Sequence, residues 1–339
     1  MKLFITGAGG FLGTAVVEQA TRRGHAVVAL VRSASSEQSL RERVGDTADA
    51  LETVRGDLRR PDDWVGALAG VDAVIHLAAT KSGGFYPQFA GTVIATESLL
   101  AAMAKASIDR LIHVSTFSVY DYQARAAGSR LDESVPAETA ESKVMGRDDY
   151  ARTKLYQERL VADAAIEQGM AVTILRPGAV WGGEELWDGG TGQIVGPLWV
   201  AAGDGVTKKF TYVENCAEAI VLAAERPESI GQTINIVDDD TPSQRDYAQM
   251  LRQRGVDVPK AVPVPFALLK AMATVLDKAN RRFVGGRARL PSMLVPAHLD
   301  ARFKPFDCPN DRAKTLLGWR PRYSVAEGLD RAIARRRQP

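Results

Sequence analysis

Short apolar runs alternate with amphipathic stretches along the first half of the chain. The runs are continuously apolar, which is typical of parallel strands covered on both faces. Strand and helix alternation of this kind predicts an α/β fold, a Rossmann-type doubly wound parallel sheet with right-handed crossovers. The predicted strands are residues 3–6, 26–31, 51–54, 73–77, 111–114 and 172–175, and the predicted helices are residues 11–23, 62–69, 92–106 and 150–168.

This alternation stops after residue 175. Residues 176–205 are rich in Gly and Trp, which predicts irregular structure with a short helix. Residues 210–224 and 233–237 fit one more helix and one more strand, and the pattern from 238 to 323 is helical with interrupting prolines. We therefore predict a dinucleotide-binding domain of residues 1–175, to which 207–237 return, and a smaller, mostly helical substrate-binding domain of residues 176–206 and 238–335.

The composition is that of a globular protein able to bury a large core, with 339 residues, 45% hydrophobic and 25% charged. A net charge of +2 gives no reason to expect a nucleic-acid partner. The two cysteines are too few for a disulfide framework, which favours a reducing, cytoplasmic compartment. Glycine at position 7 interrupts any apolar region of a signal peptide.

Two late segments have a distinctive composition. Residues 261–276 are apolar but contain Pro263, Pro265 and Lys270, so we expect a core or pocket-lining helix and no membrane span. A basic cluster follows. We interpret it as a solvated face, the alternative being contact with an anionic substrate; it comprises Arg281, Arg282, Arg287 and Arg289.

A glycine-rich loop, GAGGFLG at residues 7–13, joins the first predicted strand to the first predicted helix. Glycine permits the tight turn, the close approach of a pyrophosphate to the backbone and the contact between helix and strand. The helix N-terminus adds free N–H groups and a partial positive charge. Because the motif lies between a strand and a helix, it predicts a nicotinamide dinucleotide site. The loop residues assigned to this cofactor are Gly7, Gly10, Phe11, Leu12 and Gly13.

The end of the second predicted strand bears on the choice between NAD and NADP. An NAD site usually carries an acidic residue there, for the ribose 2′-hydroxyl. Here the strand is followed by Arg32 and no acid. A positive charge suits the 2′-phosphate of NADP, so we favour NADP over NAD. The alternative is that Arg32 is an ordinary surface residue.

A candidate for proton transfer lies on the helix predicted at 150–168. Tyr150 and Lys154 are four residues apart, so their side chains share one face. The pKa of a tyrosine phenol is about 10, and it must fall by roughly three for the phenol to act as an acid or base near neutrality. An ammonium about 4 Å away supplies about 4 kcal/mol at an effective dielectric of about 20, which is much of this shift. Ser115 and Thr116 leave the fifth predicted strand at its carboxyl end, where a hydroxyl can hold a substrate oxygen.

Further motifs extend this pattern over nearly the whole chain, which resembles an extended short-chain dehydrogenase/reductase of the NAD-dependent epimerase/dehydratase type. The motifs are TGxxGxxG at 6–13, GDL at 56–58, HLAA at 76–79, ST at 115–116, YxxxK at 150–154, LRPG at 175–178, FTYV at 210–213 and LGWxP at 317–321.

The resemblance implies a role for each matching residue. Thr116 would hydrogen-bond the reacting oxygen, and Tyr150 would be the general acid/base. Lys154 would bind the nicotinamide ribose and lower the pKa of Tyr150. The resemblance also implies a homodimer paired through the helices at 92–106 and 150–168. The remaining cofactor contacts would be Asp57 and Leu58 at the adenine, Ala78 and Ala79 along the cleft, and Pro177 beside the nicotinamide.

Departures from the family pattern narrow the reaction. Phe117 and Ser118 stand where sugar dehydratases of the family carry Asp-Glu, and Ala179 stands where nucleotide-sugar enzymes usually have asparagine. The candidate pocket residues are aromatic, which favours a hydrophobic ketone over a bare sugar, although each is equally a candidate for the core. They are Phe85, Tyr86, Trp181, Trp187, Trp199 and Phe266.

We therefore expect an NAD(P)-dependent oxidoreductase that transfers hydride between nicotinamide and a secondary alcohol or ketone of a small hydrophobic substrate. One alternative is a nucleotide-sugar epimerase with tightly bound NAD. Another is a non-catalytic redox sensor, against which the set of Thr116, Tyr150 and Lys154 argues. The histidines lack metal-ligand spacing, so no metal is expected; they are His25, His76, His113 and His298.

Overall fold

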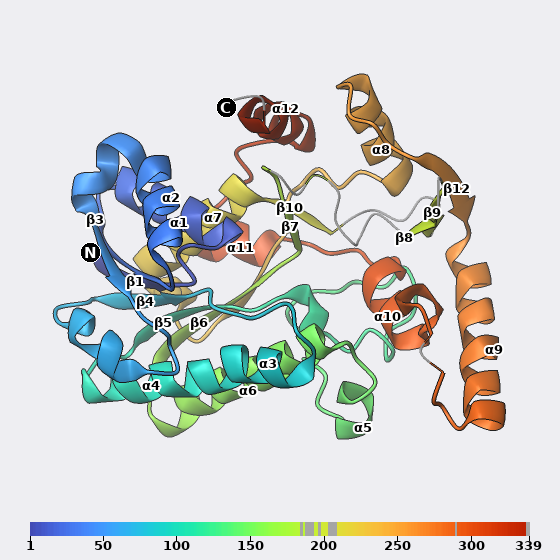
Figure 1. Cartoon of the computed structure of the whole chain (residues 1–339), viewed down its shortest axis with the longest axis horizontal. Helices are drawn as coiled ribbons and strands as arrows, with labels where there is room; N and C mark the ends of the chain where they lie inside the picture. The colour runs from blue at the N-terminus through green and yellow to red at the C-terminus, as the bar shows by residue number, and fades with distance from the viewer. Residues whose placement is uncertain (184–185, 187–192, 196–197, 203–208, 289, 337–339) are drawn as a thin grey trace.

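A seven-stranded parallel sheet forms the centre of the molecule (Figure 1). Its strand order, β11-β6-β5-β4-β1-β2-β3, reverses between β1 and β4, which is the switch point where open α/β sheets bind ligands. The predicted fold class is therefore confirmed. The strands are β1 (Lys2–Thr6), β2 (Ala26–Val31), β3 (Leu51–Arg55), β4 (Ala73–His76), β5 (Arg110–Val114), β6 (Ala171–Pro177) and β11 (Thr233–Ile236). This computed structural model describes residues 1–183, 186, 193–195, 198–202, 209–288 and 290–336.

Helices cover both faces of the sheet, and each face has its own core. Leu3 and Ile5 point to one side and join the core under α1 (Phe11–Arg22) and α7 (Val213–Glu225). Phe4, between them, points to the other side. It joins the core under α4 (Ala95–Lys105) and α6 (Asp149–Glu167). This alternation explains why the strands are apolar at every position.

Three expected elements differ in detail. The helix expected at 62–69 is wrong: two short 3₁₀-helices, Pro61–Asp63 and Val65–Leu68, occupy the segment, which is poor in helix formers. The helix expected from 92 begins at residue 85, as α3 (Phe85–Phe89) and a π-turn (Ala90–Ile94) lead into α4. The helix expected from 210 is preceded by a strand, β10 (Phe210–Tyr212).

The sequence did not predict a helix between β2 and β3. The helix found there is α2 (Ala34–Val44), in which only Leu40 and Val44 are buried, so its sequence carries little apolar periodicity. Ser33 caps its N-terminus by accepting a hydrogen bond from the Ser36 N–H at 3.2 Å. A short helix, α5 (Glu141–Val144), lies between β5 and α6.

A second group of elements lies beyond the carboxyl ends of the strands. Strand β7 (Ala179–Trp181) pairs with β10, and β12 (Lys260–Val264), β9 (Leu198–Ala202) and β8 (Gln193–Val195) form a small sheet. The described part of 176–205 thus contains strands where irregular structure with a short helix was expected. The helices here are α8 (Gln244–Gln253), α9 (Phe266–Val284) and α10 (Pro296–Phe303). No helix in the described ranges is long and apolar enough to cross a bilayer.

The last two helices, α11 (Asp311–Leu317) and α12 (Val325–Arg336), pack into the core that lies under α1 and α7. Their connection is held by Asn215 of α7. Its side-chain oxygen accepts hydrogen bonds from the N–H groups of Arg322 and Tyr323, both at 3.0 Å. Its backbone oxygen accepts one from the indole of Trp319 at 3.0 Å. The residues after 310 therefore complete the core on this side of the central sheet.

Candidate active site

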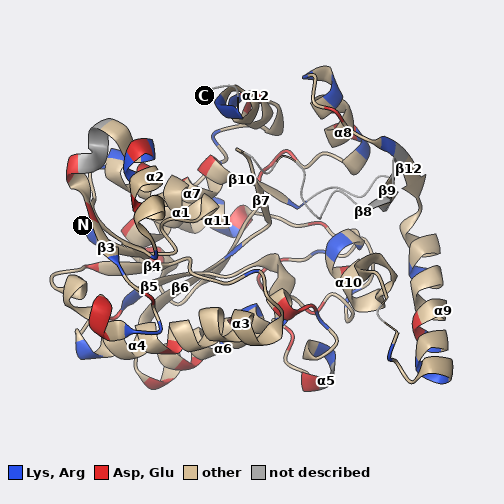
Figure 2. Ribbon diagram, in the orientation of Figure 1, with Lys and Arg blue, Asp and Glu red and all other residues tan. Residues whose placement is uncertain are grey.

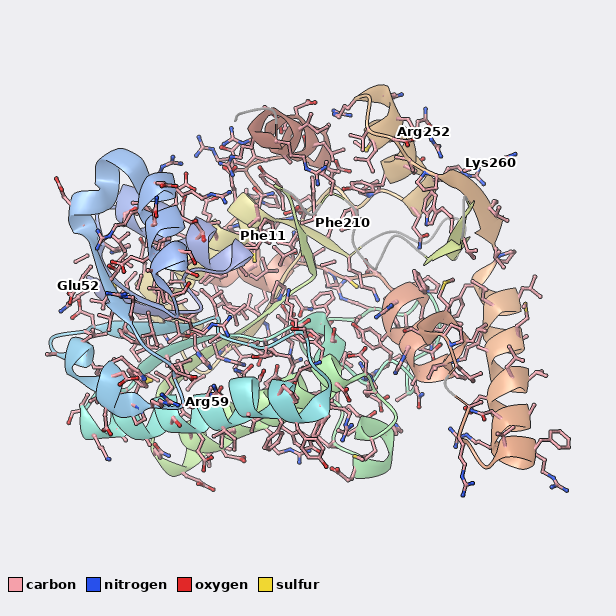
Figure 3. All side chains as sticks on the ribbon, viewed as in Figure 1. Phe11, Glu52, Arg59, Phe210, Arg252 and Lys260 are labelled. Atoms are coloured by element: carbon pink, nitrogen blue, oxygen red, sulfur yellow. The ribbon has the colours of Figure 1, made fainter. Side chains whose placement is uncertain are left out.

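The glycine loop between β1 and α1 has the shape that a dinucleotide needs. Gly7 has φ +71°, and a Cβ there would lie 2.9 Å from the backbone nitrogen of Ala78. A Cβ at Gly13 would collide with the carbonyl oxygen of Gly7. No side chain caps the first turn of α1, so its N–H groups remain available. Phe11 begins the helix, at the end of α1 that lies toward Phe210 of β10 (Figure 3). The loop therefore fits a pyrophosphate at a helix N-terminus.

A cavity of about 390 Å³ lies beside the loop, at the ends of β2 and β3. Arg32, Ser33, Arg55 and Asp57 are among its lining residues. Arg32 is exposed and forms no ion pair with any residue that the structure describes. Arg59 binds the carboxylate of Asp57 through two nitrogens and lowers its pKa to about 2 (Figure 3). Arg55 was not among the predicted residues, although it directly precedes the expected GDL motif.

Thr116 and Tyr150 meet at the carboxyl end of β5. Thr116 begins a short 3₁₀-turn, and its hydroxyl accepts a hydrogen bond from the Ser118 N–H at 3.2 Å. Burial raises the pKa of Tyr150 to about 12, and a side-chain hydrogen bond with Thr116 opposes this rise. In this environment the phenol is protonated at neutral pH. The expected lowering of the Tyr150 pKa by Lys154 stays a prediction for the cofactor-bound enzyme.

Lys154 lies buried one helical turn below Tyr150. Its ammonium donates to the Val114 carbonyl at 2.8 Å and to the side-chain oxygen of Gln157. Desolvation lowers its pKa to about 7, opposed by the negative charge of Glu158. Lys154 is thus a desolvated amine at the carboxyl end of β5, which is the place expected for a residue that binds ribose hydroxyls.

A buried network joins Lys154 to the cofactor loop, and sequence reasoning missed it. The amide nitrogen of Gln157 lies 3.2 Å from the Ala78 carbonyl, 3.0 Å from His76 and 2.8 Å from Thr96. His76 in turn lies 2.7 Å from Thr6, at the end of β1. The signal was present in the sequence, because Gln157 follows Lys154 by three residues and so shares its face. The backbone of Ala78 lies against Gly7 of the glycine loop, and Leu58 is buried in the core under α4 and α6. Pro177 ends β6.

A second missed feature is a buried ion pair directly behind Thr116. Arg176 and Glu158 are both buried, and two nitrogens of the guanidinium bind the carboxylate. Ser115 donates its hydroxyl proton to the same carboxylate. The pair therefore connects α6 with the ends of β5 and β6, the strands that carry Thr116 and Pro177.

The predicted pocket aromatics divide between core and surface. Trp181 and Trp199 are fully buried in the core, and Tyr86 is exposed. Phe85 stacks under the guanidinium of Arg152, 4.0 Å from its ring centre. Phe266 packs on a small hydrophobic cluster of the outer lobe, by which we mean the group of elements beyond the carboxyl ends of the sheet strands. Trp187 lies outside the described residues, as does Arg289.

The histidines of the sheet are structural. Burial lowers the pKa of His76 to about 3, so its ring is neutral and both nitrogens are used in hydrogen bonds. Burial also lowers the pKa of His113 well below its usual value. Within the described ranges no three His, Cys, Asp or Glu side chains are placed to hold a metal ion.

A sequence model of the NAD dependent epimerase/dehydratase family matches residues 3–237. The chain belongs to this family. It is 28% identical, over 97% of its length and 95% of the relative's, to a 4-hydroxy-2-methyl-3-oxo-4-farnesyl-3,4-dihydroquinoline-1-oxide ketoreductase of Stigmatella aurantiaca. It is 35% identical to a 2-alkyl-3-oxoalkanoate reductase of Stenotrophomonas maltophilia, with 66% of each chain covered.

Solved structures of the epimerase/dehydratase family have the same fold. The UDP-glucuronic acid 4-epimerase of Bacillus cereus, solved with UDP-glucuronic acid and NAD, superposes with a TM-score of 0.72. It is 23% identical, and the match covers 100% of this chain and 99% of that one. Relatives named as reductases, dehydrogenases and epimerases identify this chain as an NAD(P)-dependent enzyme.

Proposed function

We propose that this epimerase/dehydratase-family enzyme is an NADPH-dependent ketoreductase, which reduces the keto group of a hydrophobic substrate to a secondary alcohol. The observation that carries the proposal is the protonated Tyr150 phenol beside the Thr116 hydroxyl, with Lys154 buried one turn below. The names of the Stigmatella and Stenotrophomonas relatives, both reductases of oxo compounds, support the same reaction class. We assign the dinucleotide to residues 1–175 and 207–237, and the substrate to 176–206 and 238–335.

Each of the three side chains has a separate role in this reaction. The glycine loop would hold the dinucleotide, which would supply a hydride to the carbonyl carbon. Thr116 donates a hydrogen bond to the carbonyl oxygen and fixes its position. Tyr150 gives its phenolic proton to that oxygen as negative charge develops there. Lys154, as an ammonium beside the site, favours the phenolate that remains.

We propose NADP as the physiological cofactor because Arg32 lines the cavity at the end of β2 and pairs with no acidic side chain among the residues that the structure describes. A charge-assisted hydrogen bond to a 2′-phosphate contributes about 1.5–3 kcal/mol. Arg32→Ala should therefore raise the KM for NADPH at least about tenfold and leave the KM for NADH unchanged. Steady-state kinetics with both cofactors measure this. The matched control is Arg22→Ala, an arginine at the end of α1 that pairs with Glu18 at 2.7 Å. Equal losses with both cofactors would contradict the assignment.

We further propose a homodimer in the cytoplasm. Cys216 and Cys308 are free thiols, as a reducing compartment allows. Helices α4 and α6 contact each other on one face of the sheet (Figure 1). Ile94 and Ile166 are exposed at these helices, so two copies could bury them against each other.

The substrate class is tested by native mass spectrometry of the purified chain, followed by turnover assays with aliphatic ketones and nucleotide sugars. We expect a dimer mass and oxidation of added NADPH with a long-chain ketone. Tightly held NAD that copurifies, together with conversion of a nucleotide sugar and no net consumption of NADPH, would instead identify an epimerase. Bound dinucleotide without turnover of either class would identify a redox sensor.

A further inference from the structure

Helix α9 has two apolar faces, of which only one is covered. It forms an outer edge of the molecule, at the right of Figure 1. Its inner face packs through Leu269 and Ala273 on a cluster with Met293, Leu299 and Phe303. The face beside it, about a quarter of a turn around the helix, is open to solvent. The large apolar residues exposed there are Leu268 (53%), Met272 (46%), Val275 (66%), Leu276 (38%) and Phe283 (81%).

These exposed residues form one continuous stripe. They follow one another at intervals of four, three, one and seven residues, and Ala279 fills the longest gap. At 100° per residue this spacing places all of them on one side of the helix. A helix of 19 residues is about 28 Å long, so the stripe runs along most of that length. A contiguous apolar surface of this size is uncommon on a monomeric soluble protein and marks an interaction site.

The charges beside the stripe are positive. Asp277 is the one acidic residue of α9, and it pairs with Arg281 at 2.9 Å. Lys270 turns inward to Asp300. The exposed Lys278, Arg282 and Arg287 form no ion pair with any described residue. Figure 2 shows this basic end of α9 together with the turn that follows it.

We propose that the outer face of α9 docks on the surface of an anionic lipid bilayer. An apolar stripe with a cationic flank is the pattern of helices that lie in the plane of a membrane interface. Charge complementarity selects this occupant over a second copy of the chain. If two such faces paired, their unneutralised cations would approach each other without any acidic partner on the stripe. None of the described helices, α9 included, is both long and apolar enough to span the bilayer.

Docking in this way places the outer lobe against the bilayer. Helix α9 contacts α10 and joins β12, so it belongs to the part of the chain assigned to the substrate. If the proposed ketoreductase function holds, a hydrophobic ketone could then pass from the lipid to the enzyme without crossing water. This last step rests on the proposed function, whereas the docking itself does not.

Sedimentation of the purified full chain with lipid vesicles tests the docking. The probes are vesicles of phosphatidylcholine alone and of phosphatidylcholine with phosphatidylglycerol, at low and high salt, without cofactor or substrate. We expect binding to the anionic vesicles and weaker binding at high salt. The variant L268Q/V275Q/F283Q and the variant K278Q/R282Q should each lower vesicle binding at least about tenfold, with unchanged thermal melting. Ile230→Gln, which replaces an exposed apolar residue (41%) outside α4, α6 and α9, is the matched control and should bind like the parent.

Two outcomes would overturn the docking proposal. One is the absence of binding to anionic vesicles. The other is binding of the parent that neither multiple variant reduces, since the stripe and its cations would then be irrelevant. A change in native mass caused by the triple variant, without any vesicle binding by the parent, would assign the stripe to contact between copies. Because the assay contains no substrate, these results are independent of whether the ketoreductase proposal stands.

Discussion

Tyr150→Phe should lower the turnover of a ketone substrate by about three orders of magnitude while the protein stays folded. General acid catalysis by a positioned side chain contributes about 10²–10⁴-fold, and phenylalanine removes only the hydroxyl that donates the proton. The pKa of Tyr150 is raised to about 12, so the phenol remains protonated, and able to donate, throughout the neutral and mildly alkaline range. Single-turnover oxidation of NADPH measures the effect without interference from product release.

Helix α6 itself provides the control for this experiment. Tyr156 lies on the same helix, but its hydroxyl donates to Glu141 at the surface, at 2.9 Å. Tyr156→Phe should therefore turn over substrate within about twofold of the parent. Lys154→Ala should also reduce turnover by orders of magnitude, because it removes the cation that favours the phenolate. Near-normal activity of both Tyr150→Phe and Lys154→Ala would refute the mechanism.

Glu158→Gln should destabilise the protein by about 3–5 kcal/mol, since it leaves a buried guanidinium without its counter-charge. Glu158 binds Arg176 and accepts the hydroxyl hydrogen of Ser115, all away from solvent. Urea unfolding followed by circular dichroism measures the change. The paired replacement E158L/R176M removes both charges and should be less destabilising than Glu158→Gln alone.

An exposed ion pair supplies the comparison for this prediction. Asp330 binds Arg254 at 2.7 Å, and its side chain is largely exposed. Asp330→Asn should cost less than about 1 kcal/mol, as surface pairs do. If Glu158→Gln proves as mild as Asp330→Asn, the pair behind Thr116 is not a buried charge that the fold depends on.

The sheet was predictable because its strands are covered on both faces and are therefore apolar at every position. Elements with weaker burial were not. Helix α2 buries only Leu40 and Val44, and the segment 62–69 was read as one helix although its sequence yields two 3₁₀-turns. The helical segment that leads into α4 begins at residue 85, earlier than the predicted residue 92, because Phe85 and Phe89 contact each other and α3 contacts α6. The local periodicity of the sequence does not reveal these contacts.

The candidate site follows the same division between local and long-range information. The glycine loop and the Tyr150–Lys154 pair are encoded by spacing within one turn or helix, so the sequence predicts them. Gln157 and Glu158 were overlooked because their partners lie far away in the chain, at Ala78 and Arg176. Their positions three and four residues after Lys154 were the available signal. The burial that raises the Tyr150 pKa depends on the folded chain as a whole.

The hydrogen bonds between Asn215 and the segment 319–323 have a consequence for synthesis on the ribosome. The ribosome makes the chain from its N-terminal end, so α1 and α7 are complete before Trp319, Arg322 and Tyr323 are made. Until then the Asn215 side chain lacks partners from the C-terminal segment, and the core lacks Leu329 and Ala332 of α12. The lobe that contains the central sheet therefore reaches its final packing only after residues 319–332 have been made. Until that point a nascent chain must keep the apolar surface on this side of the sheet from aggregating.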